Sequence, residues 1–246
     1  MTPLDRLRIE KAASDCGFEM TPLEHDGGLE LRSARFPETV LVKPMTSSAL
    51  TVSTPTTGLL EAFGGVSIMR VNGFEELYDV LRTAAAHART LPDRVADAFR
   101  RETVDMPRST EAERLVVQRI GQNFFRAALL DYWQGRCCVT GLAITSLLRA
   151  SHIKPWAAST SDNERLDVFN GLLLSAHIDA LFDGGWISFS DDGGLLVSEA
   201  LSMESRQQLS LSPEWGIGKL TMAHTKYLAF HRSEVFRKMA PCHPTT

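Results

Sequence analysis

Residues 136–197 read RCCVTGLAITSLLRASHIKPWAASTSDNERLDVFNGLLLSAHIDALFDGGWISFSDDGGLLV, and this stretch decides the fold of the second half of the chain. His152 closes an apolar strand, TSLLRASHI, and Asn170 comes just before a second short strand, LLL. Asp179 lies in AHIDALFD, which predicts two helical turns with Ser175 as the N-cap and a pair of glycines at the end. The predicted order is therefore strand, strand, helix, with one polar side chain at a set place in each.

These residues resemble the HNH endonuclease family, in the subgroup that carries SHI-PW, then NGLLLS, then LFD-G-ISF. The corresponding motifs here are SHIKPW, FNGLLLS and LFDGGWISF, in the same order. The resemblance extends from RIGQNFFRAALLDYW to YLAFHRSEVF and does not include the first hundred residues. It implies a ββα-metal fold, in which one histidine activates water and one metal ion holds a phosphate, and it implies DNA as the substrate.

The resemblance also implies a role for each of the three polar residues. His152 corresponds to the general base, and a neutral imidazole with an ordinary pKa of ~6.5 can take a proton from water at pH 7. Asn170 corresponds to the residue that holds the hairpin loop, and through it the imidazole, in register. Asp179 falls where the family places a metal ligand on the helix. Because a carboxylate suits Mg²⁺ or Mn²⁺ better than zinc, we expect one of these two ions.

Two other side chains are alternatives to Asp179 as a metal ligand. His177 is close in sequence, but on a helix it points about 200° away from Asp179. Asp183 lies one turn further on and is better aligned, although it could instead fix the end of the helix. Ser151 stands immediately before the base, where many family members have an acid or a second histidine. We therefore expect substrate oxygens and water to complete the ligand set.

The net charge of −4 is unusual for a nucleic-acid binder, but positive charge gathers just before the predicted site. Residues 114–154 hold six Lys and Arg and one acid, Asp131. A phosphate-binding face would have this composition, and so would a solvated face balanced by distant acids. The candidate phosphate contacts are Arg119, Arg126, Arg149 and Lys154, with structural pairing to acids as the alternative for Arg119 and Arg126.

The cysteines indicate neither a disulfide framework nor a zinc site. Cys137 and Cys138 are adjacent, and their spacing from Cys16 and Cys242 matches no CxxC pair. Many HNH proteins carry two such pairs on a structural zinc, and we expect no structural zinc here. The apolar runs are far shorter than the ~20 residues that span a bilayer, and no signal pattern is present at the start of the sequence. We therefore expect a cytoplasmic protein with no membrane partner.

The sequence predicts an α+β chain with two domains. Residues 1–105 form a small α+β domain and residues 108–240 form the nuclease domain flanked by helices, with TVDMPRS at 103–109 as the linker. The first domain is expected to contain helices at 4–16 and 74–90, strands at 29–34, 38–43, 50–54 and 66–71, and a short helix from Thr56.

A long helix is expected to lead into the nuclease site. Thr110 and Glu113 have the spacing of a capping box, and the helix should run to about Trp133. Its apolar side is expected to include Val116, Ile120, Phe124, Ala127 and Leu130. The 17 residues between His152 and Asn170 are polar and are expected to form a loop.

Two functions are compatible with these patterns. The first is a metal-dependent DNA endonuclease of bacterial restriction or defence, with modification-dependent cutting as one form of it, in which the first domain recognises the target or senses a signal. The second is a non-catalytic DNA-binding or interaction protein that retains an HNH-like core. One site cuts one strand, so a double-strand break needs two sites or two visits, and a homodimer is one solution.

Overall fold

The computed structural model describes residues 1–46, 49–56, 58–60, 63, 67–91, 93–218 and 220–237 of the 246-residue chain. The chain divides into two compact units, Met1–Leu91 and Pro92–Thr246. Helices and small antiparallel sheets occur in both units, so the predicted α+β class is confirmed.

The division between the units lies earlier in the chain than the linker expected at 103–109. Helix α3 (Arg94–Thr103) belongs to the second unit, because its Phe99 is buried in the core of that unit. The Phe99 ring meets the Phe124 ring of helix α4 (Glu111–Tyr132) edge to face, with the ring centroids 6.3 Å apart. The 103–109 segment therefore connects two helices of one unit.

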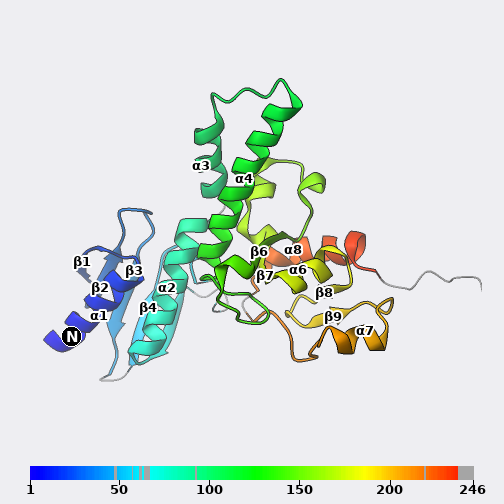
Figure 1. Cartoon of the computed structure of the whole chain (residues 1–246). Coiled ribbons are helices and arrows are strands. Elements are labelled where there is room, and N and C mark those ends of the chain that lie inside the picture. Colours follow the sequence, from blue (N-terminus) through cyan, green and yellow to red (C-terminus); the bar gives the residue numbers. More distant parts are fainter. Residues whose placement is uncertain are drawn as a thin grey trace, which may run out of the picture. The chain divides into compact units, whose positions relative to one another are not determined.

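The first unit is a five-stranded antiparallel sheet whose strands follow chain order, and helices α1 and α2 cover one face of it (Figure 1). Strand residues alternate between the helices and the open face: Leu29 and Leu31 are buried, whereas Glu30 between them is partly exposed. The elements are α1 (Pro3–Cys16), β1 (Met20–His25), β2 (Gly28–Arg32), β3 (Val40–Pro44), β4 (Ala49–Ser53), β5 (Ile68–Asn72) and α2 (Phe74–Thr90).

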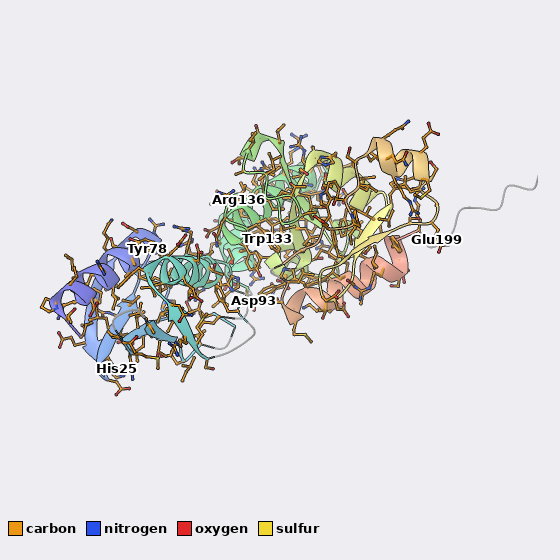
Figure 2. The ribbon with its side chains drawn as sticks, turned by 90° about the horizontal axis from the view of Figure 1, so that it is seen from below. His25, Tyr78, Asp93, Trp133, Arg136 and Glu199 are labelled. Atoms are coloured by element: carbon orange, nitrogen blue, oxygen red, sulfur yellow. The ribbon has the colours of Figure 1, made fainter. Side chains whose placement is uncertain are left out.

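Strand β1 was not expected from the sequence. It is an edge strand that contains Pro22, and its pairing with β2 is irregular between Met20 and Leu23. An edge strand tolerates a proline because one side of its backbone needs no partner in the sheet. His25 ends β1 at the hairpin (Figure 2). The short helix expected from Thr56 falls in part on positions outside the described residues.

The second unit is organised around an antiparallel pair of strands, β6 and β7, followed by helix α6 (Figure 1). The stretch between the two strands is not a simple loop as expected, because Ser161 caps a short helix, α5, within it. The elements after α4 are η2 (Thr145–Leu147), β6 (Leu148–His152), η3 (Trp156–Ala158), α5 (Asp162–Leu166), η4 (Val168–Asn170), β7 (Gly171–Ser175), α6 (Ala176–Asp183), β8 (Ile187–Phe189), β9 (Leu195–Val197), α7 (Met203–Gln208), α8 (Met222–Phe230) and η5 (His231–Val235).

Helix α4 begins as the sequence predicts but buries a different face. The capping box is confirmed, since the Thr110 hydroxyl accepts from the Glu113 backbone and the Glu113 carboxylate accepts from the Thr110 backbone. Of the expected apolar face, Ile120, Phe124 and Leu130 are partly buried against the core, whereas Val116 is 54% exposed and Ala127 is also exposed. The buried positions are Val117, Gly121, Phe125, Ala128, Leu129 and Tyr132.

The chain after α8 returns to the end of α6. The Arg237 backbone N–H donates to the Gly185 carbonyl, and Arg232 donates to the Phe189 carbonyl at 2.8 Å. The π-helical turn η5 thus packs beside β8, and it supplies His231 and Val235 to the pocket described below.

Across the described ranges, the longest apolar helical stretch falls short of what crossing a bilayer requires.

Candidate active site

His152 and Asn170 come together where the β6–β7 ladder ends. His152 is the last residue of β6 and pairs with Gly171, the first residue of β7, so the residue before Gly171 lies beside it. Trp133, at the end of α4 (Figure 2), donates its Nε1–H to the Gly171 carbonyl at 3.4 Å. Helix α4 is therefore attached to the same end of the ladder.

The imidazole of His152 is held on three sides. The Phe125 ring stacks on it with centroids 3.8 Å apart and planes 12° apart, and the Trp156 ring meets it edge to face at 5.6 Å. Its Nε2 lies 2.8 Å from the Arg165 carbonyl oxygen. A carbonyl oxygen only accepts hydrogen bonds, so Nε2 carries the proton and Nδ1 keeps a lone pair in the neutral ring.

Two glycines make room for the rings that enclose His152. A Cβ at Gly171 would lie 2.6 Å from Cζ of Phe125, and a Cβ at Gly121 would lie 2.8 Å from Cη2 of Trp156. Such distances require the ring to move. Any side chain at either position would therefore disturb the packing that orients the base.

Burial lowers the pKa of His152, and the hydrogen bond to the Arg165 carbonyl offsets part of this effect. Burial removes water from around the imidazolium and so disfavours the charged form. His152 is therefore neutral at pH 7, which is the state that can accept a proton.

Asn170 is fully buried and fixes the backbone on both sides of the loop. Its Oδ1 accepts from the Lys154 N–H at 2.7 Å, and its Nδ2 donates to the carbonyls of Lys154 and Glu164 at 3.2 and 3.1 Å. Lys154 and Glu164 are close in sequence to His152 and to Arg165, whose carbonyl holds the imidazole. Asn170 thus ties together the two segments that position the base.

Replacing Asn170 by alanine is expected to lower the free energy of unfolding by about 2–4 kcal/mol. Three backbone groups lose a buried partner, and each unsatisfied group costs roughly 1–3 kcal/mol before the structure relaxes. Urea unfolding at pH 7 measures the change. The exposed Asn123 on α4 is a matched control, whose alanine variant should stay within about 0.5 kcal/mol of wild type. Equal stability of the two variants would contradict this role for Asn170.

A pocket of about 360 Å³ opens beside the imidazole, and it contains one of the expected carboxylates. Asp183 lines it together with Ser151, whose hydroxyl donates to Oδ1 of Asp183 at 3.0 Å. The lining residues are Ala150, Ser151, His152, Ile153, Pro155, Trp156, Asp183, His231 and Val235.

Asp179 lies one helical turn before Asp183 and is not among the residues that line the pocket, but the charge of Asp183 acts on it. Burial raises the pKa of Asp179, and the charge of Asp183 raises it further, while Ser151 and Arg149 lower it. Asp183 is exposed as a whole residue, but its carboxyl group is partly withdrawn from water. This partial burial raises the pKa of Asp183 as well. Two such carboxylates would each be stabilised by a shared cation.

The oxygen atoms gathered here suit a hard cation. In the part of the chain that the structure describes, no three His, Cys, Asp or Glu side chains come together as a metal-binding group. Two carboxylates and the Ser151 hydroxyl are the protein oxygens on offer, and Mg²⁺ typically binds through one or two carboxylates while keeping several waters. The residues therefore fit Mg²⁺ or Mn²⁺.

His177 is not among the residues that line this pocket. It is exposed on α6, and its ring lies against Trp215 with the ring centroids 6.1 Å apart. The expected angular separation of His177 from Asp179 explains this placement, because both residues lie in the same regular helix. Asp183 is thus the better second ligand.

The four candidate phosphate contacts have different surroundings. Arg119 is exposed on α4 and has no ion pair or hydrogen bond among the described residues, whereas Arg126 donates to the Thr145 and Leu148 carbonyls. Arg149 is exposed at the start of β6. Lys154 is ion-paired with Glu164 at 2.6 Å, and its side chain is 17% exposed. Its charge is therefore already neutralised within the loop.

His231 was not predicted as part of this site, yet it lines the pocket. It is 1% exposed, its ring stacks on Phe182 at 3.9 Å, and its Nε2–H donates to the Phe182 carbonyl at 3.1 Å. Its Nδ1 accepts from the Ser188 hydroxyl at 3.0 Å. Burial lowers the pKa of His231 to about 4. Both ring nitrogens are engaged, so the role of His231 is to form a wall of the pocket.

Lowering the pH from 7 to 5 is expected to cost about 2 kcal/mol of stability through His231. The folded pKa of about 4 lies below the unfolded value of ~6.5, so the unfolded chain binds the proton first and stability falls from about pH 6.5 toward pH 4. Urea unfolding of wild type and His231→Gln at both pH values measures this loss, which should be smaller in the variant. His177→Gln is the exposed control and should keep the wild-type loss. An unchanged pH dependence in His231→Gln would contradict the assignment.

Comparison with known proteins identifies the central part of the second unit. Residues 137–190 match a family model described as HNH endonuclease. A search of curated proteins found no match to the chain. The matched segment contains His152, Asn170, Asp179 and Asp183, while Phe125 and His231 lie outside it. The resemblance to HNH endonucleases is therefore confirmed over residues 137–190, and this family supports a nuclease-type function. The match does not include the first unit.

Proposed function

We propose that the second unit is a metal-dependent endonuclease that hydrolyses phosphodiester bonds in DNA with His152 as the general base. One observation carries this proposal. The imidazole is fixed through Nε2 by the Arg165 carbonyl, and it lines the same pocket as Asp183 and Ser151. The proposed proton acceptor and a carboxylate that could bind a cation therefore line one cavity.

The chemistry of the protein groups follows from this geometry. Nδ1 of His152 accepts a proton from water as the water oxygen bonds to phosphorus, and the bond from phosphorus to the leaving oxygen breaks. The resulting imidazolium is poorly solvated, because the ring lies between Phe125 and Trp156. It therefore readily returns its proton to solvent. Asn170 keeps the base in place during the cycle through its bonds to the Lys154 and Glu164 backbone.

Asp179 and Asp183 would hold Mg²⁺ or Mn²⁺, with Ser151 orienting Asp183 through its hydrogen bond. When bound, the ion supplies positive charge that stabilises the phosphate oxygens and the leaving oxygen. We leave His177 out of the ligand set because its exposed ring lies against Trp215, whereas Asp179 interacts with both Asp183 and Ser151.

Arg119, Arg149 and the remaining N–H groups of Arg126 are the proposed phosphate contacts, since a guanidinium offers five donors and Arg126 uses only some of them on backbone carbonyls. Lys154 is left out because of its ion pair with Glu164. We further propose a role in bacterial restriction or defence in the cytoplasm, with the first unit recognising the target or a signal. A homodimer would allow two strands to be cut.

The test is incubation of supercoiled plasmid with the full chain in Mg²⁺, in Mn²⁺ and in EDTA. Nicking that needs the metal is expected, and methylated, hydroxymethylated and plain plasmids show whether base modification is required. If no substrate is cut with either metal while DNA is still bound, the chain is a binding protein with an HNH-like core.

A further inference from the structure

The turn that leads into β6 exposes two aliphatic side chains next to two arginines. Ile144 is 52% exposed and Leu147 is 49% exposed, on either side of the short η2 turn. Single exposed apolar residues are common on protein surfaces. This pair differs because the guanidinium groups of Arg126 and Arg149 lie at the same turn. We call residues 144–149, together with the guanidinium of Arg126, the arginine-framed turn.

The frame is built from backbone carbonyls. Arg126 donates to Leu148 and Thr145 at 2.9 and 3.0 Å, and Arg149 donates to the Ser146 carbonyl at 3.1 Å. Each guanidinium has five N–H donors, so several stay available to a ligand. Because the carbonyls already restrict these long side chains, binding an anion costs less conformational entropy than it would for a free arginine.

Charge and position both favour a polyanion over a protein partner. No Asp or Glu occurs from residue 132 to residue 161. Strand β6 has the turn at its first residue and His152 at its last, about 13 Å away, which equals roughly four base steps along one DNA strand. Arg149 also interacts electrostatically with Asp179. The turn is thus continuous with the pocket proposed to hold the scissile phosphate.

We propose that the arginine-framed turn contacts a groove of duplex DNA, with Arg126 and Arg149 on phosphates and Ile144 and Leu147 against sugar and base edges. This inference rests on the proposed nuclease function for the identity of the polyanion. Apolar side chains between phosphate-binding cations can enter a groove and loosen the stacking of a base step. The turn would therefore hold the duplex a fixed distance from His152 and bend it there.

The test separates the apolar contacts from the ionic ones. The affinity of the full chain for a short fluorescein-labelled duplex is measured by anisotropy in EDTA over a series of NaCl concentrations. Ile144→Ser/Leu147→Ser is expected to bind at least about tenfold more weakly with the salt dependence unchanged, because apolar contacts release no counterions. Arg149→Gln is expected to bind more weakly and to lower the salt slope by about one.

Matched controls come from the same unit. Met203→Ser/Met222→Ser removes two exposed apolar side chains elsewhere, and Arg206→Gln removes an arginine that also binds backbone carbonyls. Both controls should bind like wild type, and circular dichroism and light scattering should show every variant folded and in the wild-type oligomeric state.

Several results would overturn the inference. If Ile144→Ser/Leu147→Ser binds the duplex with wild-type affinity, the two aliphatic side chains do not contact DNA. If the wild type self-associates while that variant is monomeric and binds DNA unchanged, the turn is a contact between copies of the chain. A wild type that binds no duplex also rejects it. If the turn variants lose DNA binding but the wild type does not cleave DNA with any metal, the proposed DNA contact at the turn stands and only the proposed nuclease function is rejected.

Discussion

His152→Ala is expected to lower the rate of metal-dependent plasmid nicking by about 10²–10⁴-fold, the range that a positioned general base contributes. The variant keeps Asp179 and Asp183, so DNA affinity and metal affinity should stay near their wild-type values. The loss should therefore appear in the rate at saturating DNA. Single-turnover nicking, with enzyme in excess over plasmid, measures that rate directly.

Stability must be separated from chemistry in this experiment, because the His152 ring is packed between Phe125 and Trp156. His152→Gln retains a side-chain donor near the Arg165 carbonyl and should fold better than the alanine variant, yet it supplies no base. His177→Ala is the matched control, since it removes an exposed histidine that does not line the pocket. If His152→Gln is folded and nicks at the wild-type rate, another group must be the base.

The placement of His152 beside Asn170 could be predicted because it depends on local features of the sequence. A strand ending at His152 and another beginning after Asn170 pair as neighbours, and antiparallel pairing brings those two ends together. The helix after β7 begins at the predicted N-cap position, although the Ser175 side chain makes no capping hydrogen bond, and it ends at the predicted glycines. None of this requires knowledge of distant contacts.

The support of the base could not be predicted in the same way. The group that holds Nε2 is a backbone carbonyl, at Arg165, and a carbonyl has no signature in the sequence. Helix α4 carries apolar residues on two faces, and the buried face includes Gly121. A glycine is unfavourable inside a helix, but here a larger residue would collide with the Trp156 ring. The choice of Phe125 over Phe124 as the inward ring thus depends on tertiary packing.

Charged residues were difficult for a related reason. The sequence places Lys154 close to a phosphate site, but its charge is taken up by Glu164, a partner contributed by the unexpected helix α5. Arg126 was expected to pair with either phosphates or acids, and it binds backbone carbonyls. The number of cations near a site therefore overestimates the number available to a ligand.

The carboxylate pair leads to the second large prediction. Asp179→Asn and Asp183→Asn are each expected to weaken Mn²⁺ binding at least about tenfold and to lower nicking by about 10²-fold or more at a fixed metal concentration. Without metal, the same changes remove one of two neighbouring carboxylates: burial raises the pKa of both, and the charge of Asp183 raises the pKa of Asp179 further. Both variants should therefore be slightly more stable than wild type in EDTA, a gain that a purely structural carboxylate would not show.

Two measurements without DNA test this prediction independently of cleavage. Isothermal titration with Mn²⁺ gives the affinity, and urea unfolding with and without Mn²⁺ gives the stabilisation, which is about 2.7 kcal/mol for wild type at 100 times the Kd. Both should be reduced in the two variants and unchanged in Asp192→Asn, an exposed acid of the β8–β9 hairpin. Wild-type Mn²⁺ affinity in both Asp179→Asn and Asp183→Asn would rule out this pair as the metal ligands. Each variant keeps one of the two ligands and should bind Mn²⁺ weakly. Partial recovery of nicking at high Mn²⁺ would therefore show that the variant lost metal affinity and is not misfolded.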